Sequence, residues 1–356
     1  MSLSKIEILN FRNLQQVVLE PAARLNIITG DNAAGKTNLL ECIHYLSFTK
    51  SFRSAQTRDL IMYQQPYFRL IGKLDSPQTL IGIQKSPQEQ LIRINQQTIN
   101  RTADLASIFP VVAIHPDSHQ LITAGPEYRR QYLDWGVFHV EHQYLNVWKD
   151  YRKALTQRNA ALRNQQSDKL CCLWDQALVE TGLRMTTMRQ SYLDQLDISI
   201  NKLLPQLFPD TELSLDYREG WQSSTSFSSY LTENLKKDKE KGFTQGGPHR
   251  ADIRIKLNNK SVQTTISRGQ QKKLVALLKL AQMDVFSQNS EKRCVLLYDD
   301  LPAELDEKNR ANLLKILANL PVQVFITAIE ASHLDLAGWD SIKMFHVEHG
   351  QLQAGA

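Results

Sequence analysis

Hydrophobic and polar residues alternate along several segments of the first hundred residues, which is the pattern of half-buried β-strands. The later segments indicate antiparallel strands with turns between them. Two shorter runs are almost entirely apolar and are typical of buried strands, and residues 36–46 follow helical spacing. The alternating segments are KIEILNF (5–11), YFRLIGKL (67–74), TLIGIQK (79–85) and LIRINQQTIN (91–100), and the buried runs are LNIIT (25–29) and VVAIHP (111–116).

Helical spacing dominates from about residue 117 to residue 235. We expect helices at 126–138 and 144–163 and over much of 170–208, with a bend between antiparallel helices at 164–169. Two polar stretches, WQSSTSFSSY (221–230) and KKDKEKG (236–242), are predicted to be connectors.

Strands and helices alternate again after Gly242. Residues 251–267 predict a hairpin that turns at Asn258–Asn259. The remaining pattern predicts a helix at 272–286, a buried strand at 294–300, a helix at 306–320, and strands at 322–328 and 342–350. The fold class that follows is α/β: a head formed by residues 1–116 and 241–356, split around a helical arm at 117–240.

One loop carries a strong chemical signal, because ITGDNAAGKTNLL (28–40) fits the pattern G-x-x-x-x-G-K-[ST] between an expected strand and an expected helix. Glycines let the backbone approach a phosphate closely, and free N–H groups at a helix start attract its charge. Lys36 would reach the β- and γ-phosphates, and the Thr37 hydroxyl would bind Mg²⁺. We therefore predict a nucleoside triphosphate site. Its loop residues are Gly30, Asp31, Asn32, Ala33, Ala34, Gly35, Lys36, Thr37 and Asn38.

A second signal lies in VLLYDDLPAELD (295–306), where an apolar strand ends in two acids. In P-loop enzymes an aspartate there completes the metal site, so Asp299 is the candidate. Asp300 stands where a base would polarise the attacking water. Two solvated acids at the end of a strand are the alternative interpretation.

A third signal is TISRGQQKKLVALL (265–278), in which Ser267 and Gly269 precede an amphipathic helix. A hydroxyl, free N–H groups and the helix dipole would form a second phosphate-binding surface there. Because the chain has one P-loop but two such helix starts, we expect the second to serve the nucleotide of a partner subunit. An ordinary N-cap is the alternative role of Ser267.

Composition adds a modest preference for polyanions. The 356 residues include 42 Lys and Arg against 37 Asp and Glu, a net charge of +5, which permits nucleic-acid binding without demonstrating it. The four cysteines have no metal-ligand spacing, and no signal peptide or membrane-length apolar run is evident. We expect a reduced, soluble, cytoplasmic protein. The pentapeptide FHVEH occurs twice, at 138–142 and 345–349, and structural polar residues are favoured there over a metal site.

These residues resemble the RecF family, in the SMC branch of the ABC-type ATPases, over essentially the whole chain. The P-loop and the acidic strand are shared by many proteins, whereas SRGQQ followed by DDLPAELD narrows the resemblance to the ABC type. The family-specific segments are GPEYRRQYLDW (125–135) and GPHRAD (247–252), and the resemblance also includes KIEILNFRNL (5–14) and MFHVEHG (344–350).

The resemblance implies ATP and Mg²⁺ as cofactors and a role for each matching residue. Residues 30–38 would be the Walker A loop, Asp299 the Walker B residue and Asp300 the catalytic acid. The Q-loop glutamine would fall around residues 115–120. The remaining implied nucleotide contacts are the signature motif Ser267, Arg268, Gly269 and Gln270, the D-loop residue Asp306, the switch-position residue Thr327, and the N-terminal residues Arg12 and Asn13.

Two residues depart from the general ABC pattern. Asp300 replaces the more usual glutamate, and Arg268 replaces a glycine of the signature motif. Because aspartate is one methylene shorter, we expect it to hold the water less well. Slow hydrolysis would suit a switch better than a motor.

The resemblance further implies an ATP-closed homodimer that binds double-stranded DNA, single/double-strand junctions and single-stranded DNA, and works with RecR and RecO to load RecA. The residues themselves offer a basic face, because Lys149, Arg152 and Lys153 share one side of an expected helix. Phosphate contacts from such residues give salt-sensitive binding without sequence preference. A solvated helix face is the alternative. Further positive charge nearby comes from Arg129, Arg130, Arg158 and Arg163.

Two rival functions share these motifs. A transporter ATPase would carry its signature motif much closer behind the P-loop, and its hydrolysis would respond to a membrane partner rather than to DNA. A structural clamp would bind ATP without meaningful turnover, and the short acid at Asp300 keeps that possibility open. A P-loop kinase is disfavoured because no segment resembles an acceptor lid.

Overall fold

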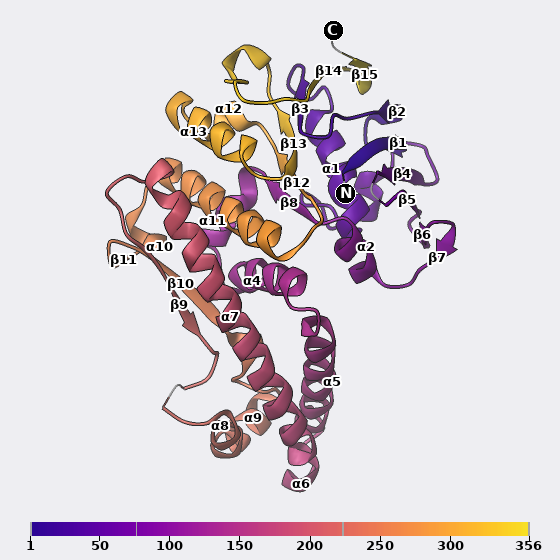
Figure 1. The fold of residues 1–356 in the computed structure, drawn as a ribbon. Helices are drawn as coiled ribbons and strands as arrows, with labels where there is room; N and C mark the ends of the chain where they lie inside the picture. The colour runs from indigo at the N-terminus through magenta and orange to yellow at the C-terminus, as the bar shows by residue number, and fades with distance from the viewer. Residues whose placement is uncertain (1, 76, 223, 355–356) are drawn as a thin grey trace. The chain divides into compact units, whose positions relative to one another are not determined.

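The computed structural model describes residues 2–75, 77–222 and 224–354, and the chain divides into two compact units (Figure 1). The first unit comprises residues 1–118 and 272–356, and the second comprises residues 119–271. The first boundary lies close to the predicted one. The second boundary lies after residue 271, well beyond the predicted residue 240. The reason is that residues 213–218 pair with residues 252–257 in one sheet, which keeps both strands in one unit.

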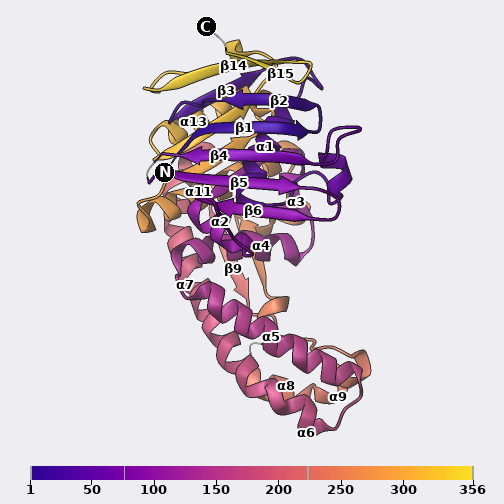
Figure 2. The ribbon, with the colours of Figure 1, turned by 90° about the vertical axis from the view of Figure 1, so that its right-hand side faces the viewer.

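The first unit contains an antiparallel six-stranded sheet in the order β2-β1-β4-β5-β6-β7. Its strands follow the predicted alternation: on β4, every second residue from Phe68 to Leu74 is buried. Figure 2 shows β1, β4, β5 and β6 side by side. The strands are β1 (Leu3–Phe11), β2 (Leu14–Leu19), β4 (Phe68–Leu74), β5 (Thr79–Lys85), β6 (Gln90–Ile94) and β7 (Gln97–Thr98).

A second sheet in this unit has the order β15-β14-β3-β13-β12-β8. All neighbouring strands are parallel except the edge strand β15. The central strands are continuous apolar runs because both of their faces are buried. The strands are β3 (Leu25–Thr29), β8 (Val111–Ile114), β12 (Cys294–Tyr298), β13 (Val322–Thr327), β14 (Ile342–Glu348) and β15 (Gln351–Ala354).

Helix α1 (Lys36–Phe48) packs against strands of both sheets, and its apolar side chains join theirs in one core. The buried amide of Gln323 also links the sheets, since it bonds the backbone N–H and C=O of Leu3. The other helical segments of this unit are η1 (Thr57–Leu60), α2 (Thr102–Ile108), η2 (Pro116–His119), α12 (Leu301–Glu304), α13 (Glu307–Ala318) and η5 (Ala331–His333), together with most of α11 (Arg268–Asn289).

The second unit combines helices with a three-stranded antiparallel sheet in the order β11-β10-β9. The hairpin that turns at Asn258–Asn259 is confirmed, and both turn residues have positive φ. The two stretches predicted as connectors contain short helices instead. The elements are α3 (Gln120–Thr123), α4 (Pro126–Val140), α5 (Tyr144–Arg163), α6 (Asp168–Cys171), η3 (Cys172–Trp174), α7 (Asp175–Leu207), β9 (Leu213–Arg218), α8 (Phe227–Glu233), α9 (Leu235–Lys241), η4 (Pro248–Arg250), β10 (Asp252–Leu257), β11 (Lys260–Ser261) and α10 (Val262–Thr265).

A buried ion cluster joins three helices of the second unit. The Arg158 side chain on α5 is 0% exposed and donates to carboxylates on α7 and α9, at 2.7 Å from Asp175 and 2.7 Å from Asp238. It also donates to the Thr244 hydroxyl at 2.8 Å. The short helix α9 is therefore held to α5 by charge as well as by apolar packing. No helix within the described ranges is both long and apolar enough to cross a membrane.

Replacing Arg158 with alanine should lower the free energy of unfolding by about 3–5 kcal/mol, because two carboxylates lose their buried partner. Urea unfolding followed by tryptophan fluorescence measures this change. The matched control is Arg163→Ala on the same helix, where the side chain is exposed and the expected change is within about 0.5 kcal/mol. Equal unfolding midpoints for the two variants would contradict the role of the cluster.

Candidate nucleotide-binding site

The glycine-rich loop leaves β3 at Thr29 and enters α1 at Lys36. Positive φ angles at Gly30 (141°) and Gly35 (122°) turn the chain, and at Gly30 a Cβ would lie 2.2 Å from the backbone oxygen of Val347. Only glycine fits so close to the backbone of β14. The loop is thus held in one conformation directly before the start of α1, and helix starts of this kind bind phosphate.

The ammonium group of Lys36 lies over this loop. It donates to the carbonyl oxygens of Gly30 at 2.7 Å and Asp31 at 2.9 Å. Burial lowers the pKa of Lys36, while the charges of Asp300, Asp299 and Asp31 act in the opposite direction. The charge of Lys36 is therefore placed between the loop and the two acids that follow β12.

The carboxylate of Asp299 connects the loop to two strands of the mixed sheet. It accepts from the Thr37 hydroxyl at 2.8 and 3.0 Å and from the Thr327 hydroxyl at 2.8 Å. The Thr327 hydroxyl in turn accepts from the backbone N–H of Asp300 at 2.7 Å. The structure thus brings together Lys36, Thr37, Asp299 and Thr327. Carboxylate and hydroxyl oxygens are hard ligands, so Thr37 and Asp299 fit a Mg²⁺ ion.

Asp300 begins α12 in the left-handed region, with φ 52° and ψ 51°. A non-glycine residue in this region is uncommon, and such strain is often found at functional sites. Asp300 makes no side-chain cap hydrogen bond to its helix. Its half-buried carboxylate thus lies next to the Asp299 site and within electrostatic reach of Lys36.

Arg12 and Asn13 brace the loop from the β1–β2 turn. The Arg12 guanidinium makes two hydrogen bonds to Glu41 on α1, one of them 2.8 Å long. The Asn13 amide donates to the backbone oxygen of Ala34 at 3.1 Å and accepts from Asn38 at 2.7 Å. Their predicted contact with nucleotide stays a prediction, and their support of the loop is an added role.

Sequence reasoning missed two residues of this site. Glu41 is 0% exposed. A charged residue on the apolar face of an expected helix was the sequence signal for a buried ion pair, and it was not used. Arg53 is exposed and donates to the Asn38 side chain at 3.0 Å, and no sequence pattern marked it. The exposed loop residues Asp31, Asn32 and Ala33 lie at the tip of the loop. The turn predicted as the Q-loop forms η2, and its role stays a prediction.

The predicted signature segment lies in the second unit, where it begins α11. Ser267 and Gln270 form a capping box: the Gln270 N–H donates to the Ser267 hydroxyl at 3.3 Å, and the Ser267 N–H donates to the Gln270 side chain at 2.9 Å. Arg268 and Gly269 are exposed, and a Cβ at Gly269 would meet no atom within 4 Å. Ser267 is therefore an N-cap within its own chain, while this exposed helix start remains open to a partner.

Asp306 likewise caps a helix. Its carboxylate accepts from the backbone N–H of Asn309 at 2.9 Å, and this hydrogen bond lowers the pKa of Asp306. The residue is exposed. The predicted D-loop contact with a second subunit stays a prediction.

The candidate DNA-binding residues fall into two groups. Arg129 is only 3% exposed and pairs with Asp252 at 2.6 and 3.1 Å, and Arg158 is fully buried. Neither can face DNA, so the prediction is wrong for both residues. Arg130 is half-buried and donates to the Ala251 oxygen. The remaining cations are exposed along α5: Lys149, Arg152, Lys153 and Arg163.

Comparison with known proteins assigns the chain to a defined class. The profile of the RecF/RecN/SMC N terminal domain matches residues 2–353. The Smc head domain of Pyrococcus furiosus superposes with a TM-score of 0.62 at 15% identity, covering 99% of this chain and 96% of that one, which shows a shared fold. The fold and the site together define an ABC-type ATPase head of the SMC branch, and the predicted fold class is confirmed.

Closer relatives narrow this class. The DNA replication and repair protein RecF of Thioalkalivibrio sulfidiphilus and that of Cellvibrio japonicus are each 40% identical to this chain, with full coverage of both sequences. A structure of the recombination mediator protein RecF with ATPrS superposes with a TM-score of 0.86 at 29% identity, covering 99% of this chain and 98% of that one. The chain belongs to the RecF family.

Gly30→Ala should destabilise the first unit by about 1–3 kcal/mol, because alanine is strained at this φ and its methyl group would meet the backbone of β14. Thermal unfolding without nucleotide measures the effect. The control is Gly269→Ala, which has open space and should leave stability unchanged or raise it by up to about 1 kcal/mol. A Gly30→Ala protein as stable as this control would show that the close approach to Val347 is unimportant.

Proposed function

We propose that this protein is an ATP-dependent DNA-binding protein of DNA replication and recombinational gap repair. The observation that carries the proposal is the contact of Asp299 with Thr37 and Thr327, which assembles the P-loop and the acidic strand into one nucleotide site. Support comes from the relatives, which are named DNA replication and repair protein RecF, and from a solved structure, 28% identical, described as RecF-ATP in the RecFOR pathway.

In this proposal each residue of the site has one task. The loop N–H groups and Lys36 bind the phosphates, and Thr37 and Asp299 hold Mg²⁺, which would neutralise phosphate charge. Asp300 orients the attacking water as a weak base. Because its side chain is short, the ATPase is slow, and DNA stimulates it.

The protein acts as a homodimer closed by ATP. Support comes from the exposed start of α11, where Arg268 and Gly269 have no covering side chains close by, and from the exposed Asp306. A helix start with free N–H groups suits a phosphate, and in a dimer it would face the nucleotide held by the partner's P-loop. Hydrolysis then removes the phosphate that joins the two copies.

Asp300→Asn should lower ATP turnover about a hundredfold or more, because an amide cannot take the proton of the attacking water. ATP binding and ATP-dependent dimerisation should persist, since Asp299 and Lys36 remain. Phosphate release measures turnover, and sedimentation with ATP, a non-hydrolysable analogue and ADP measures dimerisation. Loss of ATP binding would contradict the assignment of Asp300, and undiminished turnover would make another acid the base.

The DNA surface that we propose lies on α5 and the adjoining GPHR loop of the second unit. Arg152 stacks on Trp148 and Arg250 stacks on Phe243, with each guanidinium carbon 5.3 Å from the ring centre. Within the described residues, neither forms an ion pair. These aromatic rings hold the guanidinium groups in place without neutralising them, which suits a phosphate backbone.

Half-buried His249 joins the two parts of this surface. Its ring bonds the Tyr151 hydroxyl at 2.6 Å, and burial lowers the pKa of His249 to about 4, with the charges of Arg250, Arg130 and Arg152 acting in the same direction. The neutral histidine thus joins α5 to the loop that carries Arg250, and three arginines surround it. This group replaces Arg129 and Arg158 of the initial prediction and keeps Lys149 and Lys153 as neighbours on α5.

The expected DNA targets are double-stranded DNA, single/double-strand junctions and single-stranded DNA, read through backbone and shape. The expected protein partners are RecR and RecO, which act with this protein in loading RecA in the cytoplasm. The solved relatives described as part of the RecFOR pathway support this assignment.

DNA binding should require ATP and weaken steeply with salt, because phosphate contacts release counterions. Fluorescence anisotropy of a labelled duplex across salt concentrations, with ATP, ADP or no nucleotide, measures both effects. Lys36→Arg should lose the response to ATP. Equal binding in all three nucleotide conditions would remove the ATP switch from the proposal.

In the same assay, Arg152→Ala and Arg250→Ala should each weaken binding at all sequences and reduce the salt slope by about 1. The matched control is Arg184→Ala, an exposed arginine of the same unit on α7, which should bind normally. An unchanged slope in both test variants would place the DNA elsewhere on the chain.

A further inference from the structure

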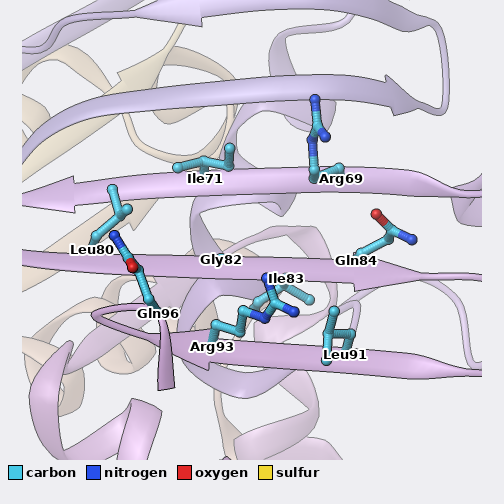
Figure 3. A pocket seen from close by; sticks show the side chains of 9 residues that line it. All are labelled: Arg69, Ile71, Leu80, Gly82, Ile83, Gln84, Leu91, Arg93 and Gln96. Carbon is cyan, nitrogen blue, oxygen red and sulfur yellow. The ribbon is translucent and has the colours of Figure 1, made fainter. Parts of the chain in front are cut away.

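The outer face of the antiparallel sheet has a hollow of about 280 Å³ over β4, β5 and β6 (Figure 3). Its centre is Gly82 on β5, opposite Ile71 of β4 on one side and Arg93 of β6 on the other. A Cβ at Gly82 would meet no atom within 4 Å. The hollow exists because the residue at the middle of the central strand has no side chain.

Aliphatic side chains border this hollow. Leu80 is 42% exposed and Leu91 is 37% exposed, and Ile71 is half-buried between them and β1. A single exposed leucine is ordinary on a protein surface. These three aliphatic side chains line one depression, and exposed apolar surface of this kind is what another apolar group covers.

Both charged residues that line the hollow are arginines, and the acid on the neighbouring strand, Glu7 opposite Ile71, is paired with Lys5 at 2.8 Å. Arg69 and Arg93 line it, and neither guanidinium forms an ion pair with a residue in the described ranges. Strands β4, β5 and β6 also carry Lys73 and Lys85 and contain no aspartate or glutamate. A ligand that covers the leucines would therefore bind more tightly if it carried negative charge on both sides of its apolar group.

We propose that this hollow binds an acidic segment of a partner protein, with an apolar side chain over Gly82 and carboxylates paired with Arg69 and Arg93. Arginine and carboxylate form strong two-pronged hydrogen bonds, which would fix the direction of the segment. The hollow is smaller than the roughly 300–1,000 Å³ of small-molecule pockets, so one or two side chains fill it. Nucleic acid fits less well, because no aromatic ring lines the hollow for base stacking and phosphates would leave the leucines uncovered.

The test uses a fluorescein-labelled octapeptide of alternating aspartate and leucine, titrated with the full chain without nucleotide. The same peptide with asparagine in place of aspartate is the charge control. Gly82→Leu fills the hollow without changing its charge, and the double variant Arg69→Glu/Arg93→Glu reverses the charge without filling it. Each should weaken binding about tenfold or more, which is 1.4 kcal/mol or more. Arg58→Glu, an exposed arginine in η1 of the same unit, should bind within about twofold of the unaltered chain.

Thermal unfolding and ATP binding of every variant show whether the fold and the nucleotide site are intact, so the result does not depend on the proposed function. Preference for the aspartate peptide, lost in both test variants but kept in Arg58→Glu, supports the proposal. Equal binding of the two peptides would overturn it, as would a Gly82→Leu chain that binds normally. Competition by a single-stranded oligonucleotide whose own binding is lost in Gly82→Leu would assign the hollow to nucleic acid instead.

Discussion

The candidate nucleotide site depends on one interaction, in which two threonine hydroxyls donate to the carboxylate of Asp299. Thr37 lies in the first turn of α1, Thr327 at the end of β13, and Asp299 directly after β12. The carboxyl ends of parallel strands meet a helix start at this edge of the sheet, which is where α/β folds bind ligands. A buried carboxylate is costly without hydrogen-bond donors, so the bonds that hold Asp299 in place also keep it available to a cation.

The rest of the first unit holds the glycine-rich loop still. The backbone of β14 approaches Gly30, the N–H of Gly350 donates to the Ala34 oxygen at 2.9 Å, and Asn13 bonds the same oxygen. The ion pair of Arg12 with Glu41 joins the β1–β2 turn to the helix behind the loop. The loop therefore has a fixed conformation in the absence of phosphate, which reduces the conformational entropy lost on binding.

Arginines of the second unit show how one residue type takes two roles. Arg158 and Arg189 are buried among aspartates and join helices, whereas Arg152 and Arg250 stack on aromatic rings and keep their charge exposed. Sequence spacing placed Lys149, Arg152 and Lys153 on one face of α5, and all three are exposed, because helical geometry alone decides which side chains share a face. Sequence spacing could not show that Arg129 is buried while Arg130 is only half-buried, because Arg129 pairs with Asp252, a residue far along the chain.

By itself the sequence determined most of the strands, the long helices, the glycine-rich loop and the acidic strand of this RecF-family protein, because each follows from local periodicity or from the steric freedom of glycine. The strands β2 and β9 were not predicted. Tertiary structure alone decided that Thr327 contacts Asp299, that Glu41 pairs with Arg12, that β10 joins β9 in the second unit, and that Gly82 leaves a hollow between its neighbours. Those outcomes depend on strand register and on pairings between residues distant in the chain, and no local pattern encodes either one.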